Sequence, residues 1–302
     1  MMIFSERSRL VARSIFFMAA TSLFFALGAR LIFFGFPPSI TALISNREQA
    51  AAAASVMSPF LYEFRVDGTL EESGASDEST SPYWWLDSGG RLVLEDGRGK
   101  TLSGSLPALD RWRVRYALSS AGDTANGAQP QNLFRLLTRS DWENVRAEMS
   151  FRIRADNFLD SPNRNESNGL FLMSRYEDGD NLYYAGIRVD GTAVIKKKYK
   201  GAYYTLAQEK VFDGNYSRGA QVNLLPHDEW ITLRSETETI SEMAVTIKLF
   251  LKREDADDWQ LLISATDRGD NDSTPPISGA HPLGIRTDFM EVEFDDFRAE
   301  NI

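Results

Sequence analysis

The residues with the most distinctive chemistry form a basic and aromatic cluster. Its members are Arg175, Tyr176, Tyr183, Tyr184, Arg188, Lys196, Lys197, Lys198, Tyr199, Lys200, Tyr203 and Tyr204. Arginine and lysine bind carboxylates and sulfates, and aromatic rings offer flat apolar faces to a sugar ring. The cluster therefore predicts binding of an anionic carbohydrate. A structural role stays open, because exposed strands also carry lysines against edge pairing and tyrosines for their strand propensity.

Period-two alternation decides which of these side chains share a face. Tyr184 and Arg188 share one face of a predicted strand, and Lys196 and Lys198 share one face of the next. If these faces coincide, an anion-binding groove results. The predicted ligand-binding residues are Arg135, Arg175, Tyr184, Arg188, Lys196, Lys198 and Tyr204.

A second constellation is acidic and consists of Glu291, Glu293, Asp295 and Asp296. Its spacing resembles the paired-carboxylate strand motif of family 16 glycoside hydrolases. Retaining glycosidases hold two carboxyl groups about 5–5.5 Å apart, which residues two apart on a strand roughly supply. The third position departs from the motif in spacing. The alternative is a terminal strand on which Asp295 and Asp296 hold a structural calcium ion through carboxylate oxygens.

Polysaccharide-lyase chemistry is a further alternative for the basic and aromatic cluster. It needs a base such as tyrosine beside the uronate and a cation that neutralises the carboxylate. The cluster holds both residue types, but the glutamine–histidine strand motif of jelly-roll lyases is absent.

Composition excludes several classes of site. The chain has no cysteine, which rules out disulfides and thiolate metal ligands. Its two histidines, His227 and His281, leave little room for a multi-histidine zinc site. Residues 1–47 carry five arginines and one glutamate, and the remainder carries 28 basic and 42 acidic residues, a net charge of −14. A body this acidic is a poor general binder of nucleic acid.

The N-terminal region predicts a membrane segment. Residues 14–36 form a 23-residue apolar stretch, long enough to cross a bilayer as a helix. Three arginines precede it and place the N-terminus in the cytoplasm. A cleaved signal peptide or a buried helix are the alternatives. The predicted organisation is a basic N-terminus at 1–13, a signal anchor at 14–36, a stalk at 37–58 and an exported domain at 59–302, which is periplasmic or extracellular.

The period changes to two in the exported domain. About fourteen strands are expected, separated by Asp-Gly and Gly-Gly turns. Their predicted ranges are 60–66, 91–95, 112–118, 132–138, 145–154, 169–176, 181–189, 192–199, 203–207, 229–235, 244–252, 259–265, 283–287 and 290–297. Short strands without long amphipathic helices predict an all-β, two-sheet antiparallel jelly-roll sandwich. The long loops 119–131, 155–168 and 266–282 are candidates for functional segments.

A family resemblance appears over about residues 130–300. It rests on the stretch 168–207 (NGLFLMSRYEDGDNLYYAGIRVDGTAVIKKKYKGAYYTLA), Trp230, Gly284-Ile285-Arg286 and the final VEFDDFRAENI. This order resembles the concanavalin A-like lectin/glucanase superfamily, including laminin-G-like modules. The resemblance implies two antiparallel sheets, often a calcium ion, and frequently a carbohydrate ligand.

Taken together, these patterns predict a membrane-anchored carbohydrate-binding protein. A polysaccharide lyase or glycoside hydrolase that uses the same groove is the enzymatic alternative. A laminin-G-like protein-interaction module is a third hypothesis.

Overall fold

The structure is a computed structural model that describes residues 58–270 and 273–302. The predicted segments 1–13 and 14–36, and all but the last residue of the stalk, lie outside the described residues. Within the described ranges, no helix is long and apolar enough to cross a membrane.

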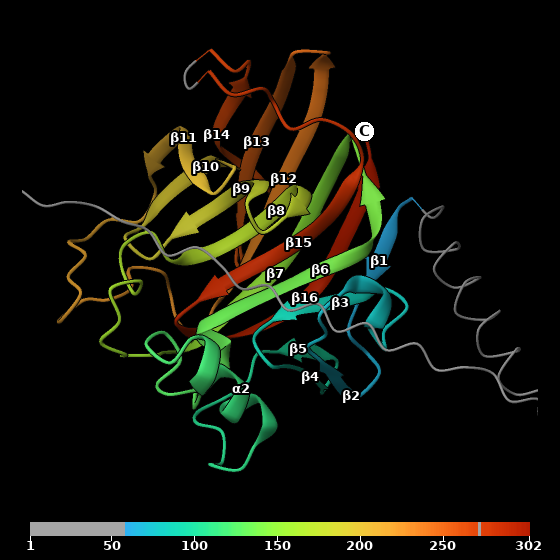
Figure 1. The fold of residues 1–302 in the computed structure, drawn as a ribbon. Coiled ribbons are helices and arrows are strands. Elements are labelled where there is room, and N and C mark those ends of the chain that lie inside the picture. The colour runs from blue at the N-terminus through green and yellow to red at the C-terminus, as the bar shows by residue number, and fades with distance from the viewer. Residues whose placement is uncertain (1–57, 271–272) are drawn as a thin grey trace, which may run out of the picture. The chain divides into compact units, whose positions relative to one another are not determined.

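The described chain forms two antiparallel β-sheets, which Figure 1 shows as two layers. One sheet has nine strands, in the order β14 (Gln260–Asp267), β13 (Ala244–Arg253), β12 (Trp230–Ser241), β7 (Val145–Asp156), β16 (Met290–Asn301), β5 (Arg98–Lys100), β4 (Arg91–Glu95) and β2 (Gly68–Glu71), with β1 (Phe60–Tyr62) also paired to β16. The other has seven, in the order β11 (Ala202–Lys210), β10 (Thr192–Tyr199), β9 (Asn181–Arg188), β8 (Gly169–Asp178), β15 (His281–Asp288), β6 (Leu133–Trp142) and β3 (Trp84–Ser88). The prediction of an all-β, two-sheet, jelly-roll-like sandwich is confirmed.

The main core lies between the two sheets. Alternate residues of β7, such as Met149 and Phe151, are fully buried, and so are Tyr183 and Ile195 from the facing sheet. Burial of one such side chain contributes roughly 1.5–3 kcal/mol. This core fixes which residues of each strand point outward, and so determines the outer face of the seven-stranded sheet.

One predicted strand is wrong. Residues 112–118 belong to the helix α2 (Arg111–Ser119). The Asp110 carboxylate caps it by accepting a 2.8 Å hydrogen bond from the Trp112 amide. Trp112 and Tyr116, four residues apart, pack together on one helix face. Two short 3-10 helices, Ser76–Glu78 and Pro130–Asn132, complete the elements, and β2, β3 and β5 were not predicted.

The seven-stranded sheet carries a second, smaller apolar layer on its outer face. It comprises Leu137, Phe171, Met173, Tyr176, Leu182, Tyr184 and Val194, with Trp85 packed against them. Such a packed apolar layer can hold the side chains of a binding site in fixed positions on the sheet.

Candidate functional site

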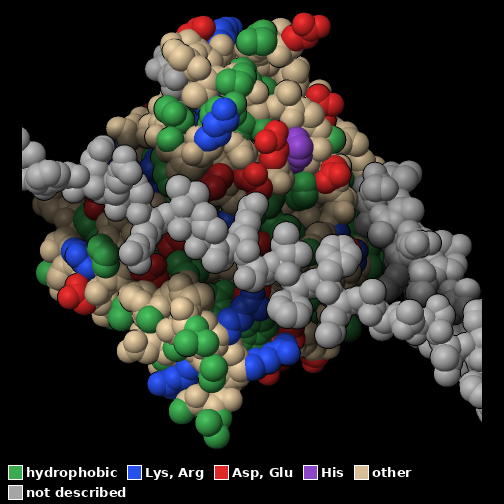
Figure 2. Space-filling view, in the orientation of Figure 1, with side chains coloured by type: hydrophobic (Ala, Val, Ile, Leu, Met, Phe, Trp, Pro, Cys, Tyr) green, Lys and Arg blue, Asp and Glu red, His purple; other side chains and the backbone are tan. Residues whose placement is uncertain are grey.

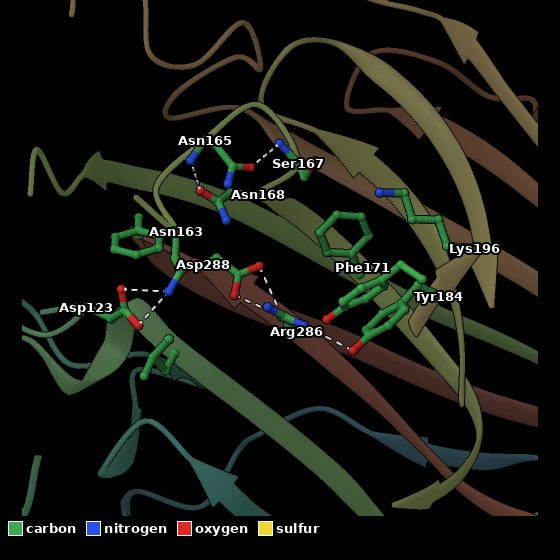
Figure 3. Close-up of a pocket in the computed structure, with 13 residues that line it drawn as sticks. Asp123, Asn163, Asn165, Ser167, Asn168, Phe171, Tyr184, Lys196, Arg286 and Asp288 are labelled. Carbon is green, nitrogen blue, oxygen red and sulfur yellow. Dashed lines mark hydrogen bonds and ion pairs between the residues drawn. The ribbon is translucent and has the colours of Figure 1, made fainter. Parts of the chain in front are cut away.

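A cavity of about 510 Å³ opens on the outer face of the seven-stranded sheet (Figure 3). Its volume lies within the range of small-molecule sites, about 300–1,000 Å³. Its lining comes from β11, β10, β9, β8 and β15, from the start of β6, and from the loops that precede β6 and β8. The lining residues are Asp123, Leu133, Asn163, Asn165, Ser167, Asn168, Phe171, Tyr184, Lys196, Tyr203, Arg286, Asp288 and Phe289.

The floor depends on a close approach between Gly186 and Phe171. These residues lie opposite each other in β9 and β8. A Cβ atom on Gly186 would lie 2.7 Å from both Cα and Cδ1 of Phe171, and would also collide with the Leu170 carbonyl oxygen. The absent side chain therefore leaves room for the Phe171 ring, which packs edge-on against Tyr184 with ring centroids 6.0 Å apart.

Arg286 lies between Asp288 and Tyr184 and is hydrogen-bonded to both. Its Nε donates to both carboxylate oxygens of Asp288, at 2.9 and 3.1 Å, and its guanidinium donates a 3.0 Å hydrogen bond to the Tyr184 hydroxyl (Figure 3). Asp288 is almost fully buried, whereas the Arg286 side chain stays partly exposed to the cavity. Burial raises the pKa of Asp288, and the charges of Arg286 and Arg135 oppose that rise.

Two tyrosines near Arg286 differ in acidity. The rings of Tyr184 and Tyr203 stack with centroids 6.1 Å apart. Burial raises the pKa of Tyr184 to about 12, against the opposing charge of Arg286. For Tyr203, burial is outweighed by the charge and hydrogen bond of Arg286 and by the charge of Lys198, and its pKa lies below the ordinary value of 10.0. Neighbouring groups with divergent pKa values are typical of functional sites.

The cations of this face are mostly neutralised by nearby carboxylates. The pairs are Arg135 with Asp87, Arg188 with Asp190 at 2.8 Å, Lys198 with Asp180 at 2.9 Å, and Arg286 with Asp288 at 2.9 Å. Figure 2 shows acidic and basic side chains interspersed on the side that faces the viewer.

Lys196 is the exception. It is half-buried in the cavity wall, and its ammonium group has no ion pair or hydrogen bond with the described residues. Desolvation and the nearby charge of Arg188 lower its pKa from 10.5. A cation in this position can bind an anionic group, and none of the residues in 58–270 and 273–302 supplies one.

An amide-rich loop forms the opposite wall. The Asn168 side-chain oxygen accepts a 2.8 Å hydrogen bond from the Asn165 amide, which fixes the loop conformation. Asp123, from the loop after α2, accepts hydrogen bonds from the buried Ser161 hydroxyl and, at 3.0 Å, from the Asn163 side chain. Asp123 thus ties the two loops that border the cavity.

The structure brings Tyr184 and Lys196 of the predicted residues into the cavity lining. Arg135, Arg188 and Lys198 lie on the same outer face, but in ion pairs and outside that lining.

Arg175 and Tyr204 point elsewhere. Arg175 has a positive φ of 51° at a bulge of β8, and its fully buried side chain donates a 2.8 Å hydrogen bond to the Thr239 hydroxyl. Tyr204 lies opposite Lys197, whose buried ammonium pairs with Asp267 of the other sheet at 2.9 Å. Its neighbour Tyr203 faces the cavity instead.

The acidic constellation lies on β16 in the nine-stranded sheet, away from the cavity. Glu291 accepts from the Ser103 hydroxyl at 2.7 Å, and Glu293 is ion-paired with Arg152. Asp295 and Asp296 occupy a bulge. No group of three or more His, Asp or Glu side chains that could hold a metal ion occurs in residues 58–270 and 273–302.

Several lining residues were not predicted as site residues, namely Phe171, Arg286, Asp288 and the amides of the loop at 163–168. Tyr203 belongs to the predicted basic and aromatic cluster, but the ligand-binding residue predicted in its place is Tyr204. Two signals pointed towards them. Arg286 belongs to the Gly284-Ile285-Arg286 motif of the family resemblance, and the loop is one of the three long loops of the sequence.

Comparison with known proteins yields only distant likenesses. No protein-family model matches the chain, and no curated protein sequence matches it significantly. Among solved structures, the carbohydrate-binding module CBM66 from Bacillus subtilis shares 14% identity over 72% of this chain and 95% of its own, with a TM-score of 0.44. A Bacillus licheniformis β-glucanase shares 10% sequence identity over 82% of this chain and 99% of its own, with a TM-score of 0.40. The exoplasmic/lumenal domain of VIP36 shares 9% sequence identity over 80% of this chain and 92% of its own, with a TM-score of 0.41. Likenesses at this level carry no statement about ligand or activity.

Proposed function

We propose that this protein binds a carbohydrate with a negatively charged group, such as a uronate or a sulfated sugar, in the cavity of the seven-stranded sheet. One observation carries the proposal: the half-buried Lys196 in the cavity wall has no partner among the described residues. Burial of an unpaired charge costs free energy. An anionic ligand group would offset this cost.

The rest of the lining suits a sugar. Phe171, Tyr184 and Tyr203 supply apolar ring surfaces with two hydroxyl groups, which match the alternating apolar and polar character of a sugar ring. The asparagines of the opposite wall can both donate and accept hydrogen bonds.

A glycan screen tests the proposal. The purified full-length protein is applied to an array of neutral, uronate-containing and sulfated glycans, and the best ligand is then titrated by calorimetry. We expect retention of acidic glycans without release of a product. Binding of neutral glycans alone, or of no glycan, would overturn the proposal, and the second result would favour a protein-interaction module.

The contrast between the two tyrosines favours a second candidate function, the cleavage of a uronate polysaccharide by β-elimination. Tyr203, the more acidic of the two, would first lose its hydroxyl proton to solvent and would then take the proton next to the carboxylate. The electron pair would form a carbon–carbon double bond, and the glycosidic C–O bond would break. The leaving oxygen would take its proton from Tyr184, whose high pKa keeps it protonated. A lyase generates unsaturated ends that absorb ultraviolet light, and Tyr203→Phe would abolish that signal while binding persists.

We also infer from the sequence that residues 14–36 anchor the protein in a membrane with the sandwich outside the cytoplasm. The support is the apolar length of this stretch and the arginines that precede it. Membrane fractionation with protease treatment of intact cells tests this inference. A protein that stays with the soluble cytoplasmic fraction would contradict it.

A further inference from the structure

We propose that the recognition surface continues from the cavity across β15 and β6 to Arg135 and Trp85, so that the ligand is a chain of several sugar units with more than one negative charge. This inference rests on the proposed function of the cavity. It assigns a second subsite to a part of the face that lies outside the cavity lining.

Arg135 lies beside Arg286 on the outer face. These residues are direct partners in the antiparallel register of β6 and β15, and both point outward. Arg135 also acts electrostatically on two residues of the cavity. Burial raises the pKa of Tyr184 and of Asp288, and the positive charge of Arg135 opposes both rises. The two subsites therefore adjoin each other.

Aromatic side chains pack around Arg135. Its guanidinium lies 5.2 Å from the centroid of the Tyr176 ring, and Tyr176 in turn packs edge-on against Trp85 at 6.4 Å. Tyr176 itself is buried, and burial raises its pKa to about 12, so it supports Arg135 and Trp85 as a neutral ring. A cation next to aromatic surface repeats the combination found in the cavity.

The two neighbouring arginines have an electrostatic cost. Like charges directly opposite each other on neighbouring strands destabilise a sheet. Arg135 and Arg286 occupy such a pair of positions, and each is offset by one aspartate, Asp87 and Asp288. Each guanidinium has more N–H donors than one aspartate can accept from, so both arginines can also bind ligand groups. Two adjacent arginines therefore suit a ligand that carries negative charges at successive positions.

The dimensions agree with a polymer. The face from Tyr203 on β11 to Trp85 on β3 crosses six gaps between neighbouring strands. At about 4.8 Å for each gap, this is roughly 29 Å, far longer than one sugar ring.

The test is the dependence of affinity on chain length. Full-length wild-type protein and the double variant Arg135→Gln/Asp87→Asn are titrated by calorimetry with uronic acid monosaccharides and with matched oligouronates up to the hexasaccharide. The double variant removes both charges of the pair, so that neither is left unpaired in the fold. The matched control is Arg234→Gln/Glu148→Gln, which removes an ion pair of similar burial between neighbouring strands of the nine-stranded sheet.

We expect wild-type affinity to rise roughly tenfold between the monosaccharide and the hexasaccharide. The double variant should still bind the monosaccharide but should lose this rise. The control variant should behave as wild type. An unchanged rise in the double variant, or no rise in wild type, would overturn the second subsite while leaving the cavity intact. Failure of wild type to bind any member of the series would instead overturn the proposed function.

Discussion

Lys196 lies directly opposite Tyr184 in the antiparallel register of β10 and β9. The pairing puts an ammonium group and a phenol on one outward face, next to the guanidinium that binds the Tyr184 hydroxyl. Since the ammonium has no partner among the described residues, its charge is available to a ligand.

Removal of that charge should weaken binding without unfolding the protein. For Lys196→Met we expect a loss of about 1.5–3 kcal/mol, or roughly ten- to a hundredfold in affinity for an acidic glycan, as for a hydrogen bond to a charged group. Calorimetric titration measures the loss. The control is Lys200→Met, because Lys200 is an exposed lysine at the far end of the same hairpin. Equal losses in both variants would contradict a specific role for Lys196.

The affinity should also depend on pH. Desolvation and the charge of Arg188 lower the pKa of Lys196 below 10.5, so the ammonium loses its proton at a lower pH than an exposed lysine does. Affinity for an acidic glycan should therefore fall as pH rises through this lowered pKa. Calorimetry over an alkaline pH series measures the fall, which should disappear in Lys196→Met. A fall of the same size in that variant would assign it to another group.

Substitution of Gly186 should disturb the cavity floor. A methyl group in Gly186→Ala collides with backbone and ring atoms of Phe171, so we expect a loss of about 1–3 kcal/mol in the free energy of unfolding and weaker ligand binding. Urea denaturation and calorimetry measure the two effects. The control is Gly68→Ala, another strand glycine, whose added methyl group would meet nothing within 4 Å and should leave stability unchanged or slightly higher. Equal effects of the two substitutions would contradict this account of Gly186.

Loss of the Asp123 carboxylate should loosen the amide-rich wall. In Asp123→Ala the buried Ser161 hydroxyl loses its acceptor, which costs about 1–3 kcal/mol. We expect faster hydrogen exchange in residues 157–168 and reduced ligand affinity. Asp123→Asn, which keeps an acceptor oxygen, should show a smaller effect. Unchanged exchange in this segment of Asp123→Ala would show that other contacts hold the wall.

The stability of the fold should vary with pH near neutrality because of His227. The hydrogen bond and charge of Asp156, 3.0 Å away, raise the pKa of His227 above 6.5. The raised pKa means that this stabilisation is fully present below pH 6.5 and is lost as pH rises through the folded-state pKa. Urea midpoints measured on both sides of this window should differ less in His227→Gln than in wild type. An identical difference in the variant would assign the pH dependence elsewhere.

Much of the fold was predictable because alternation is a local property. The ranges 91–95 and 192–199 agree with β4 and β10 at both ends. The range 112–118 also alternates, but the capping hydrogen bond that the Trp112 amide donates to Asp110 and the packing of residues four apart favour a helix there. The three-residue strand β5 is too short to show any period.

The site was less predictable because it depends on nonlocal pairing. Alternation correctly grouped Tyr184 with Lys196, whose strands are neighbours in sequence. Arg286 reaches the cavity only because β15 pairs with β8. The two strands are more than 100 residues apart in the sequence, so no local pattern shows this pairing. Local backbone geometry decided the remaining cases. Arg175 leaves the outer face because its positive φ breaks the alternation of β8, and the register of β11 selects Tyr203 over the adjacent Tyr204.

The pairing of cations with neighbouring carboxylates on the outer face has a consequence for the speed of binding. Paired charges contribute little to the field at a distance, and the whole chain has a net charge of −10. An acidic ligand therefore approaches against a repulsive field and is attracted only at contact, within the Debye length of about 8 Å at physiological ionic strength. Added salt screens the long-range repulsion between the acidic protein and the acidic ligand more than it screens the contact of the ligand with the half-buried Lys196. Moderate salt should therefore raise the association rate constant. This is the reverse of the salt dependence expected for a protein with a uniformly basic binding face.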